Sequence, residues 1–143
     1  MNNQYFQAIL QIIRTGHWIT DQVSIELKEF DITEPQYNVL RILRGAKGEP
    51  LTVQRILESM VQRSSNVTRI VDKLKAKGYV QRKKCPRNRR KMDITITESG
   101  LEILKEMDEK LQAFHKPMMV NLNNEELETL KNLIIKLKSH NND

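Results

Sequence analysis

The sequence has 143 residues, which suits a single domain spanning 1–143, and its 38% hydrophobic and 29% charged residues indicate a helical protein with a well-hydrated surface. Its one cysteine, Cys85, argues against a disulfide scaffold or a structural zinc site and favours a reducing compartment. The N-terminal residues do not resemble a signal peptide, and no apolar run approaches the roughly 18 residues of a membrane span, so we expect a cytoplasmic protein without membrane association.

The first predicted element is a helix over 4–29. Its apolar residues, among them Phe6, Ile9 and Ile13, recur at helical spacing. Gly16 interrupts this pattern at a modest cost of about 1 kcal/mol relative to alanine. We therefore expect one long helix rather than two short ones.

The next helix is predicted to begin in the stretch DITEPQYNVLRIL. Thr33 is placed to cap it, with Gln36 three residues later as in a capping box, and Pro35 is tolerated in the first turn. The loop-like stretch RGAKGEP should end it. Its expected apolar side consists of Tyr37, Leu40, Ile42 and Leu43.

Two shorter helices are predicted after that loop. Thr52 should cap the first, over about 53–59, and Ser64 or Ser65 should cap the second, which runs to about Lys77. Gly78 follows as the residue type that commonly ends a helix. The second of these helices places four apolar residues on one face: Val67, Ile70, Val71 and Leu74.

After Gly78 the apolar period changes from helical to alternating. Met92, Ile94 and Ile96 alternate with polar residues, which predicts a half-buried strand with 80–84 as its antiparallel partner. Between these strands lies RKKCPRNRRK (82–91), which holds seven basic residues and no acid. We expect this stretch to form the tip of a hairpin.

Helical spacing returns from Glu98 to the end of the chain. Pro117 should end or kink a first helix, and Asn123 with Glu126 should cap a second. The two apolar rows step by three and four residues: Leu104, Met107, Leu111, Phe114 and Met118, then Leu127, Leu130, Ile134 and Leu137. These rows need a partner surface, and the chain offers only one other long helix.

The net charge of +6 is concentrated in the middle of the chain. Residues 51–97 hold 13 basic and 3 acidic residues, whereas residues 1–50 carry a net charge of −1 and residues 98–143 a net charge of −3. A basic segment of this density indicates a polyanionic partner. The alternative is a solvated surface that only aids solubility.

Two short helices followed by a hairpin, over about 33–97, are typical of a winged helix-turn-helix. The expected fold class is therefore mainly α with a small β-hairpin wing (α+β). In helix-turn-helix proteins the second helix lies in the major groove of DNA. The polar side chains at its start can contact base edges and phosphates: Ser64, Ser65, Asn66, Thr68, Arg69 and Lys73. The alternative is that the serines and Asn66 only cap the helix.

The hairpin would hold its basic tip beside the phosphate backbone, or insert an arginine into the minor groove, where the potential is most negative. Binding of DNA would relieve the repulsion among the seven cations. The residues expected to contact DNA from the wing are Arg87, Asn88, Arg89, Arg90 and Lys91.

A two-part motif runs from Leu51 to Gly100. Its first part consists of Val67-Thr68-Arg69, Val71-Asp72, Leu74, Gly78 and Val80, and its second of Pro86, Arg89, Arg90, Ile94, Ile96, Thr97 and Gly100. This motif resembles the MarR family of bacterial transcription regulators. The two parts together are specific, and the flanking helices extend the resemblance over nearly the whole chain.

The resemblance has departures in the wing. The family's two acidic positions fall on Cys85 and Asn88, and Arg87 replaces a residue that is often acidic. In the family the second acid braces the wing arginine that enters the minor groove, which here is Arg90. An asparagine accepts a hydrogen bond without charge assistance, so we expect a looser and more basic wing.

The resemblance implies a homodimer, paired through the helices at about 4–29 and 98–139, that binds a pseudo-palindromic operator in double-stranded DNA. It also implies a repressor that is relieved by a small aromatic or anionic effector. His17, Trp18 and Tyr37 could line the effector pocket, although each is more simply explained as ordinary packing. No cofactor is implied.

Other classes of function have weaker support in the sequence. No Ser/His/Asp, Cys/His or glycine-rich phosphate motif appears, so an enzyme is not expected. The three histidines lie on different predicted helices, so a metal site is not expected. Cys85, beside several cations, could be redox-responsive but is more simply an ordinary residue at a strand end. The main rival is a basic architectural or RNA-binding protein without operator specificity.

Overall fold

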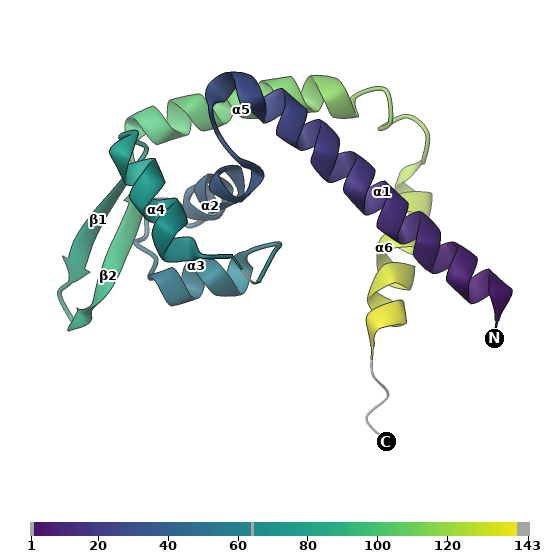
Figure 1. The fold of residues 1–143 in the computed structure, drawn as a ribbon, viewed down its shortest axis with the longest axis horizontal. Coiled ribbons are helices and arrows are strands. Elements are labelled where there is room, and N and C mark those ends of the chain that lie inside the picture. The colour runs from purple at the N-terminus through teal and green to yellow at the C-terminus, as the bar shows by residue number, and fades with distance from the viewer. Residues whose placement is uncertain (1, 64, 140–143) are drawn as a thin grey trace. The chain divides into compact units, whose positions relative to one another are not determined.

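A computed structural model describes residues 2–63 and 65–139 of the chain (Figure 1). The chain divides into two compact units, Met1–Glu109 and Lys110–Asp143. The first unit contains the winged helix-turn-helix, so the predicted fold class is confirmed. The assignment of 1–143 to a single domain stays a prediction.

The N-terminal helix α1 spans Asn3–Leu27 and continues into a 3-10 turn, η1, over Lys28–Phe30. The Asn2 side chain caps α1 by accepting a hydrogen bond from the backbone N–H of Gln4. Leu27 is fully buried, but apolar residues of the N-terminal half, such as Phe6 and Ile13, are about half exposed. The helix is therefore packed on the first unit only at its C-terminal end and leaves apolar surface uncovered.

Helix α2 spans Glu34–Gly45 and begins as the sequence predicts. Thr33 and Gln36 form the capping box, and Pro35 lies in the first turn. Val39 and Leu40 are fully buried, whereas Ile42, which was expected on the apolar side, is only half-buried. Helix α3 spans Val53–Ser59 and is capped by Thr52, also as predicted.

Helix α4 spans Val67–Ala76 and starts later than the sequence predicts. The expectation that Ser64 or Ser65 caps this helix is wrong, because the Asn66 side chain accepts the hydrogen bond from the backbone N–H of Arg69. Val67, Val71 and Leu74 are buried, and Ile70 is half-buried. The C-terminal end follows the prediction, with Gly78 at a φ of +79°.

The hairpin consists of β1, Val80–Cys85, and β2, Asn88–Ile96, and it lies beside α4 (Figure 1). Both strands are longer than predicted, so the turn is reduced to Pro86 and Arg87 and most of the basic stretch is in strand conformation. Leu51 adds a short bridge to the hairpin, since its N–H and C=O bond the C=O and N–H of Ile94 at 3.0 and 2.8 Å. Ile94 is fully buried, whereas Met92 and Ile96 are half-buried.

Helix α5 spans Glu98–His115, and its first turn is bonded to the base of the hairpin. The Thr97 hydroxyl donates to the carbonyl of Gly78 at 2.7 Å and accepts from the N–H of Gly100 at 3.0 Å. Gly100 lies so close to Tyr79 that a Cβ at this position would be 2.3 Å from the Tyr79 carbonyl oxygen. Thr97 and Gly100 therefore pack the first turn of α5 against Gly78 and Tyr79, the residues that follow α4.

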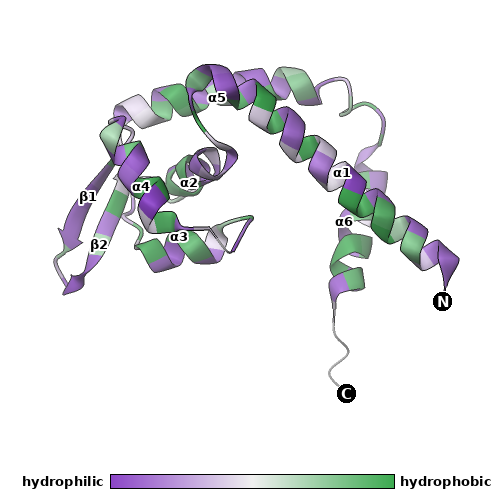
Figure 2. Ribbon diagram, in the orientation of Figure 1, coloured by the Kyte–Doolittle hydropathy of each residue, from purple (hydrophilic) through white to green (hydrophobic). Residues whose placement is uncertain are grey.

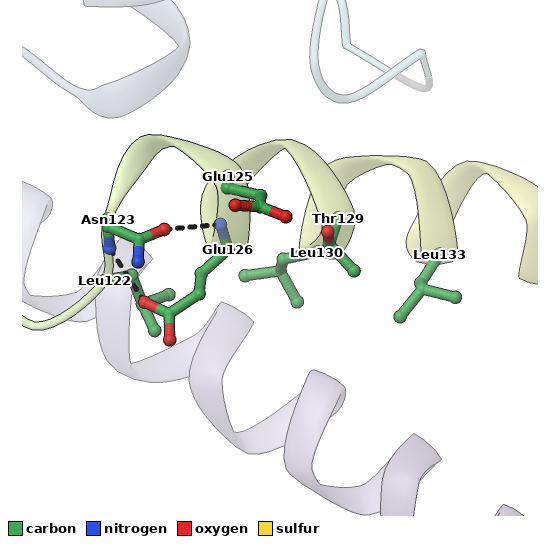
Figure 3. A pocket seen from close by; sticks show the side chains of 7 residues that line it. All are labelled: Leu122, Asn123, Glu125, Glu126, Thr129, Leu130 and Leu133. Atoms are coloured by element: carbon green, nitrogen blue, oxygen red, sulfur yellow. Dashed lines mark hydrogen bonds between the residues drawn. The ribbon is translucent and has the colours of Figure 1, made fainter.

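The second unit contains helix α6, which spans Asn124–Lys138. Asn123 and Glu126 form the predicted capping box, and α5 ends at His115, before Pro117 as expected. The apolar row remains open: Leu127 and Leu130 are 45% and 46% exposed. A hollow of about 520 Å³ lies on this helix, with Leu122, Leu130 and Leu133 on one side of it (Figure 3).

The helices of the described ranges include none that is both long and apolar enough to cross a membrane.

The close approach at Gly100 leads to a prediction about stability. Gly100→Ala should lower the free energy of unfolding by about 1–3 kcal/mol or more, because the new methyl group collides with backbone that cannot yield cheaply. Gly16→Ala is the matched control, since nothing lies within 4 Å of a Cβ there. This second change should raise stability by about 1 kcal/mol. Chemical denaturation of both variants provides the measurement, and equal effects would contradict the packing argument.

Candidate nucleic-acid interface

The outer face of α4 is polar and exposed. Thr68, Arg69 and Lys73 all lie in solvent, on the side of the helix away from the buried Val67, Val71 and Leu74. No acid among the described residues pairs with Arg69 or Lys73. Their side chains are therefore available to a ligand that carries acceptors, such as phosphate or base edges.

The turn before α4 is fixed by local hydrogen bonds. The Ser65 hydroxyl donates to the carbonyl of Gln62 at 2.6 Å, and the Asn38 carboxamide of α2 accepts from the N–H of Val61 at 2.9 Å. Ser65 thus stabilises the turn, a role not anticipated from the sequence. Ser64, also predicted to contact DNA, lies outside the described residues.

A small hollow of about 210 Å³ lies between the start of α2 and the outer edge of α4. Both helices begin there, so both contribute partial positive charge from their N-termini. The hollow is lined by Thr33, Pro35, Gln36, Gln62, Ser65, Asn66, Arg69, Ile70 and Lys73. Six residues at and before the start of α4 were predicted to contact DNA. Four of them, Ser65, Asn66, Arg69 and Lys73, line this hollow.

The wing carries three of its cations on a bulge. Lys84 pairs with Met92, but the next residue, Cys85, pairs with Asn88, so Arg89, Arg90 and Lys91 have no partner in β1. The Asn88 carboxamide accepts a hydrogen bond from the backbone N–H of Arg90 at 3.1 Å. The bulge pushes the three side chains out of the ladder, and the outer parts of both strands are strongly hydrophilic (Figure 2).

The hydrogen bond of Asn88 refines the prediction made for it. Its oxygen holds the backbone of Arg90, and the Arg90 guanidinium has no described acidic partner. Arg87 occupies the two-residue turn beside Pro86 and is exposed. The residues predicted in the wing are thus brought to one end of the hairpin, and their repulsion is spread over a turn and a bulge.

Arg82 differs from the other six cations of the stretch. Its Nη1 lies 2.8 Å from Oδ1 of Asp72 on α4, and its side chain is only 29% exposed. The alternation of β1 could have revealed this position, because Arg82 shares the strand face of the buried Val80. The backbone pairing of Leu51 with Ile94 could not have been predicted from the sequence in this way. A single paired residue produces no alternating pattern of apolar side chains.

Of the three residues proposed for an effector pocket, Tyr37 has a clear structural role. The Tyr37 hydroxyl donates to Oδ1 of Asp108 on α5 at 2.6 Å, and Arg44 pairs with the same carboxylate. Burial, together with this bond and the negative charge of Asp108, raises the pKa of Tyr37 to about 12. His17 and Trp18 lie on a largely exposed stretch of α1. Tyr37 thus ties α2 to α5, and the pocket stays a prediction.

Cys85 is half-buried at the end of β1, beside the turn. Within residues 2–63 and 65–139, no three His, Cys, Asp or Glu side chains gather into a group that could hold a metal ion.

Known proteins share both the sequence pattern and this architecture. The profile of the MarR family matches residues 32–92. An uncharacterised helix-turn-helix-type transcriptional regulator of Bacillus cereus is 30% identical over 132 residues, which cover 92% of this chain and 86% of that protein.

Two solved structures illustrate the likeness in three dimensions. The crystal structure of a MarR-like transcription regulator from Bacillus cereus ATCC 10987 has a TM-score of 0.82 and 26% identity, covering 99% of this chain and 100% of that one. The S. aureus MepR–DNA complex has a TM-score of 0.78 at 21% identity, covering 92% and 94%, and shows the same fold.

The capping role of Asn66 changes how its contact with DNA must be tested. Asn66→Ala should lower stability by about 1 kcal/mol through loss of the cap, whereas Asn66→Ser should retain most of the cap. If the Asn66 amide also contacts a base edge, both variants should lose about 1–3 kcal/mol of discrimination between operator and random DNA. Binding titrations on both DNAs, with thermal melts in parallel, provide the measurement. Full discrimination by Asn66→Ser would restrict Asn66 to capping.

Proposed function

The chain belongs to the MarR family of DNA-binding transcription regulators, and on this basis we propose that it acts as a homodimeric, sequence-specific repressor. The observation that carries the proposal is the joint exposure of unpaired cations on α4 and on the wing bulge. Two surfaces on one compact unit suit two successive grooves of one duplex. Such a protein acts where the chromosome lies, so we place it in the bacterial cytoplasm.

In the proposed complex, α4 enters the major groove. The width of that groove admits one helix, and residues near the helix N-terminus approach base edges. Arg69 is suited to a bidentate contact with guanine, while Thr68 and Asn66 offer shorter donors and acceptors. Lys73, one turn later, would neutralise a phosphate. We propose that Ser65 at the turn also contacts DNA, and the contact expected of Ser64 stays a prediction.

The wing would follow the neighbouring minor groove. Arg90 extends from the bulge without an acidic partner among the described residues, so its guanidinium can insert where the groove is narrow and most negative. Arg87, Arg89 and Lys91 flank it and would bind phosphates on either side. The loose hold that Asn88 has on Arg90 favours affinity over selectivity for groove shape.

Dimerisation is supported by apolar surface that the two units leave open. On α6, Leu130 and Leu137 lie on one face and are each 46% exposed, and on α1, Phe6 and Ile13 are 47% and 50% exposed. Large apolar patches of this kind mark interfaces rather than monomer surface. A two-fold symmetric pair would place two α4 helices about 34–36 Å apart, on a pseudo-palindromic operator.

The repressor would be relieved by a small aromatic or anionic effector. Trp18 and His17 on α1, with Tyr37 on α2, supply aromatic side chains of the kind such a ligand would stack against. The rival is an architectural or RNA-binding protein, which would share the basic surface. That rival has no need of two open apolar helix faces, so the open faces favour the dimeric regulator.

The deciding experiment combines sedimentation with footprinting. We expect a dimer at micromolar concentration and a protected, pseudo-palindromic site in the DNA upstream of the protein's own gene. A stable monomer, or equal affinity for every duplex, would overturn the proposal. Protection of RNA in preference to duplex DNA would favour the rival.

A wing prediction follows from the bulge. Arg90→Ala should weaken binding to all duplexes and reduce the slope of log K against log salt by about 0.9 for each wing. It should also remove a preference for A·T-rich flanks, where the minor groove is narrow. Titration at two salt concentrations, on duplexes that differ only in their flanks, measures both effects.

Asn88→Asp is the companion variant. The new carboxylate can still accept from the Arg90 N–H and can add charge assistance to the guanidinium. Preference for A·T-rich flanks should rise, while affinity for random DNA should fall slightly because the added carboxylate lowers the net positive charge of the wing by one unit. Equal weakening on both DNAs would show that the wing is only an electrostatic clamp.

A further inference from the structure

One ion pair joins the helix and the wing of the proposed interface. Asp72 lies on α4, one turn after Thr68 and Arg69, and its Oδ1 accepts from Nη1 of Arg82 on β1 at 2.8 Å. Asp72 is the only acid in α4, and α4 and β1 are in contact along this edge. The pair therefore lies at the seam between the two surfaces expected to enter adjacent grooves.

We propose that the Asp72–Arg82 pair determines how sharply this protein discriminates its operator from other DNA, acting as a positioning device rather than as a DNA contact. It works in two ways: it keeps the Asp72 charge away from Arg69, and it fixes the wing against α4. The inference rests on the proposed function.

The first effect is electrostatic. Arg69 precedes Asp72 by three residues, a spacing at which opposite charges on a helix can pair. Asp72 is engaged instead by Arg82, and Arg69 has no acidic partner among the described residues. Without Arg82, the Asp72 carboxylate is left to the cations at pairing distance along its own helix, which are Arg69 three residues before it and Lys75 three residues after it. Pairing with Arg69 would neutralise that guanidinium at the position where it should meet a base.

The second effect is geometric. The hairpin is fixed at its base, through Ile94 to Leu51 and through Thr97 to Gly78. Within the described ranges, Arg82 is the last residue toward the tip that bonds to α4. Its Nε is buried without a hydrogen-bond partner, so the side chain is enclosed in the seam and held by its one Nη1 contact. Beyond it come the bulge and Arg90.

The pair is partly exposed, at 29% and 54% for the two side chains. Ion pairs in such positions contribute little to stability. Its loss should therefore change the distribution of charge and the mobility of the wing much more than the melting temperature. This distinction separates a positioning role from a merely structural one.

Lys83 is the matched control for Arg82. It is the next residue of β1, it is exposed on the opposite face of the strand, and it pairs in register with Asp93. Lys83→Ala removes one positive charge from the same strand and leaves the Asp72–Arg82 pair intact. It should weaken operator and random DNA equally and lower the salt slope by at most about 0.9 per protomer.

Arg82→Ala should behave differently. Because Asp72 already compensates the Arg82 charge, the salt slope should stay unchanged, or fall if Arg69 no longer contacts DNA. The ratio of operator affinity to random-DNA affinity should fall about tenfold, as for the loss of one base contact. Adding Arg69→Ala to Arg82→Ala should then cause little further loss of discrimination. Asp72→Asn should also release Arg82, so binding to random DNA and its salt slope should rise. If Arg82→Ala matches Lys83→Ala in both ratio and slope, the inference is overturned.

Amide hydrogen exchange of the DNA-free protein tests the geometric half independently. Arg82→Ala should speed exchange between Lys84 and Met92, whereas Lys83→Ala should not, and Arg82→Lys should restore slow exchange by restoring the charge. Unchanged exchange in Arg82→Ala overturns the fixed wing. Failure of the unsubstituted protein to bind any duplex would instead overturn the proposed function, and the exchange data would still decide the role of the pair.

Discussion

The attachment of Ile94 is the constraint on which the rest of the DNA-facing surface depends. Its side chain is fully buried, and its backbone N–H and C=O both bond to Leu51, at the entry to α3. Together with the bond from Thr97 to Gly78, Ile94 fixes the hairpin to the helix-turn-helix, and its burial sets which face of β2 points inward. Because a strand alternates strictly, this single register decides the direction of every side chain toward the base of the wing.

With the base fixed, the charge at the tip can be accommodated. Seven cations in ten residues repel one another, and a regular ladder would hold them close. The structure separates them by three devices: Arg82 is paired with Asp72, Arg87 lies in the turn, and the bulge displaces Arg89, Arg90 and Lys91 from β1. The same devices leave the exposed cations available to a polyanion, so the arrangement that relieves the repulsion also produces the proposed function.

The apolar residues of the long helices fall into a buried set and an exposed set. Near the end of α1 and in the middle of α5, buried residues such as Leu27, Leu104 and Met107 belong to the first unit's core. On the N-terminal half of α1 and on α6, residues of the same type stay exposed. Helices with one apolar face are stable only when that face is covered. A second copy of the chain would satisfy both faces, which links the folding of these helices to the proposed operator symmetry.

The sequence by itself determined the element order, the caps at Thr33, Thr52 and Asn123, and the family, because these depend on local hydrogen bonds and on a period of apolar residues. It also located the basic segment, since charge needs no fold to be counted. Only the tertiary structure decided that Asn66 rather than a serine caps α4, that Arg82 belongs to Asp72, and that Arg90 lies on a bulge. The physical reason is that each of these outcomes is a choice between partners, made by which backbone or carboxylate happens to lie nearest once α4, β1 and β2 are packed together.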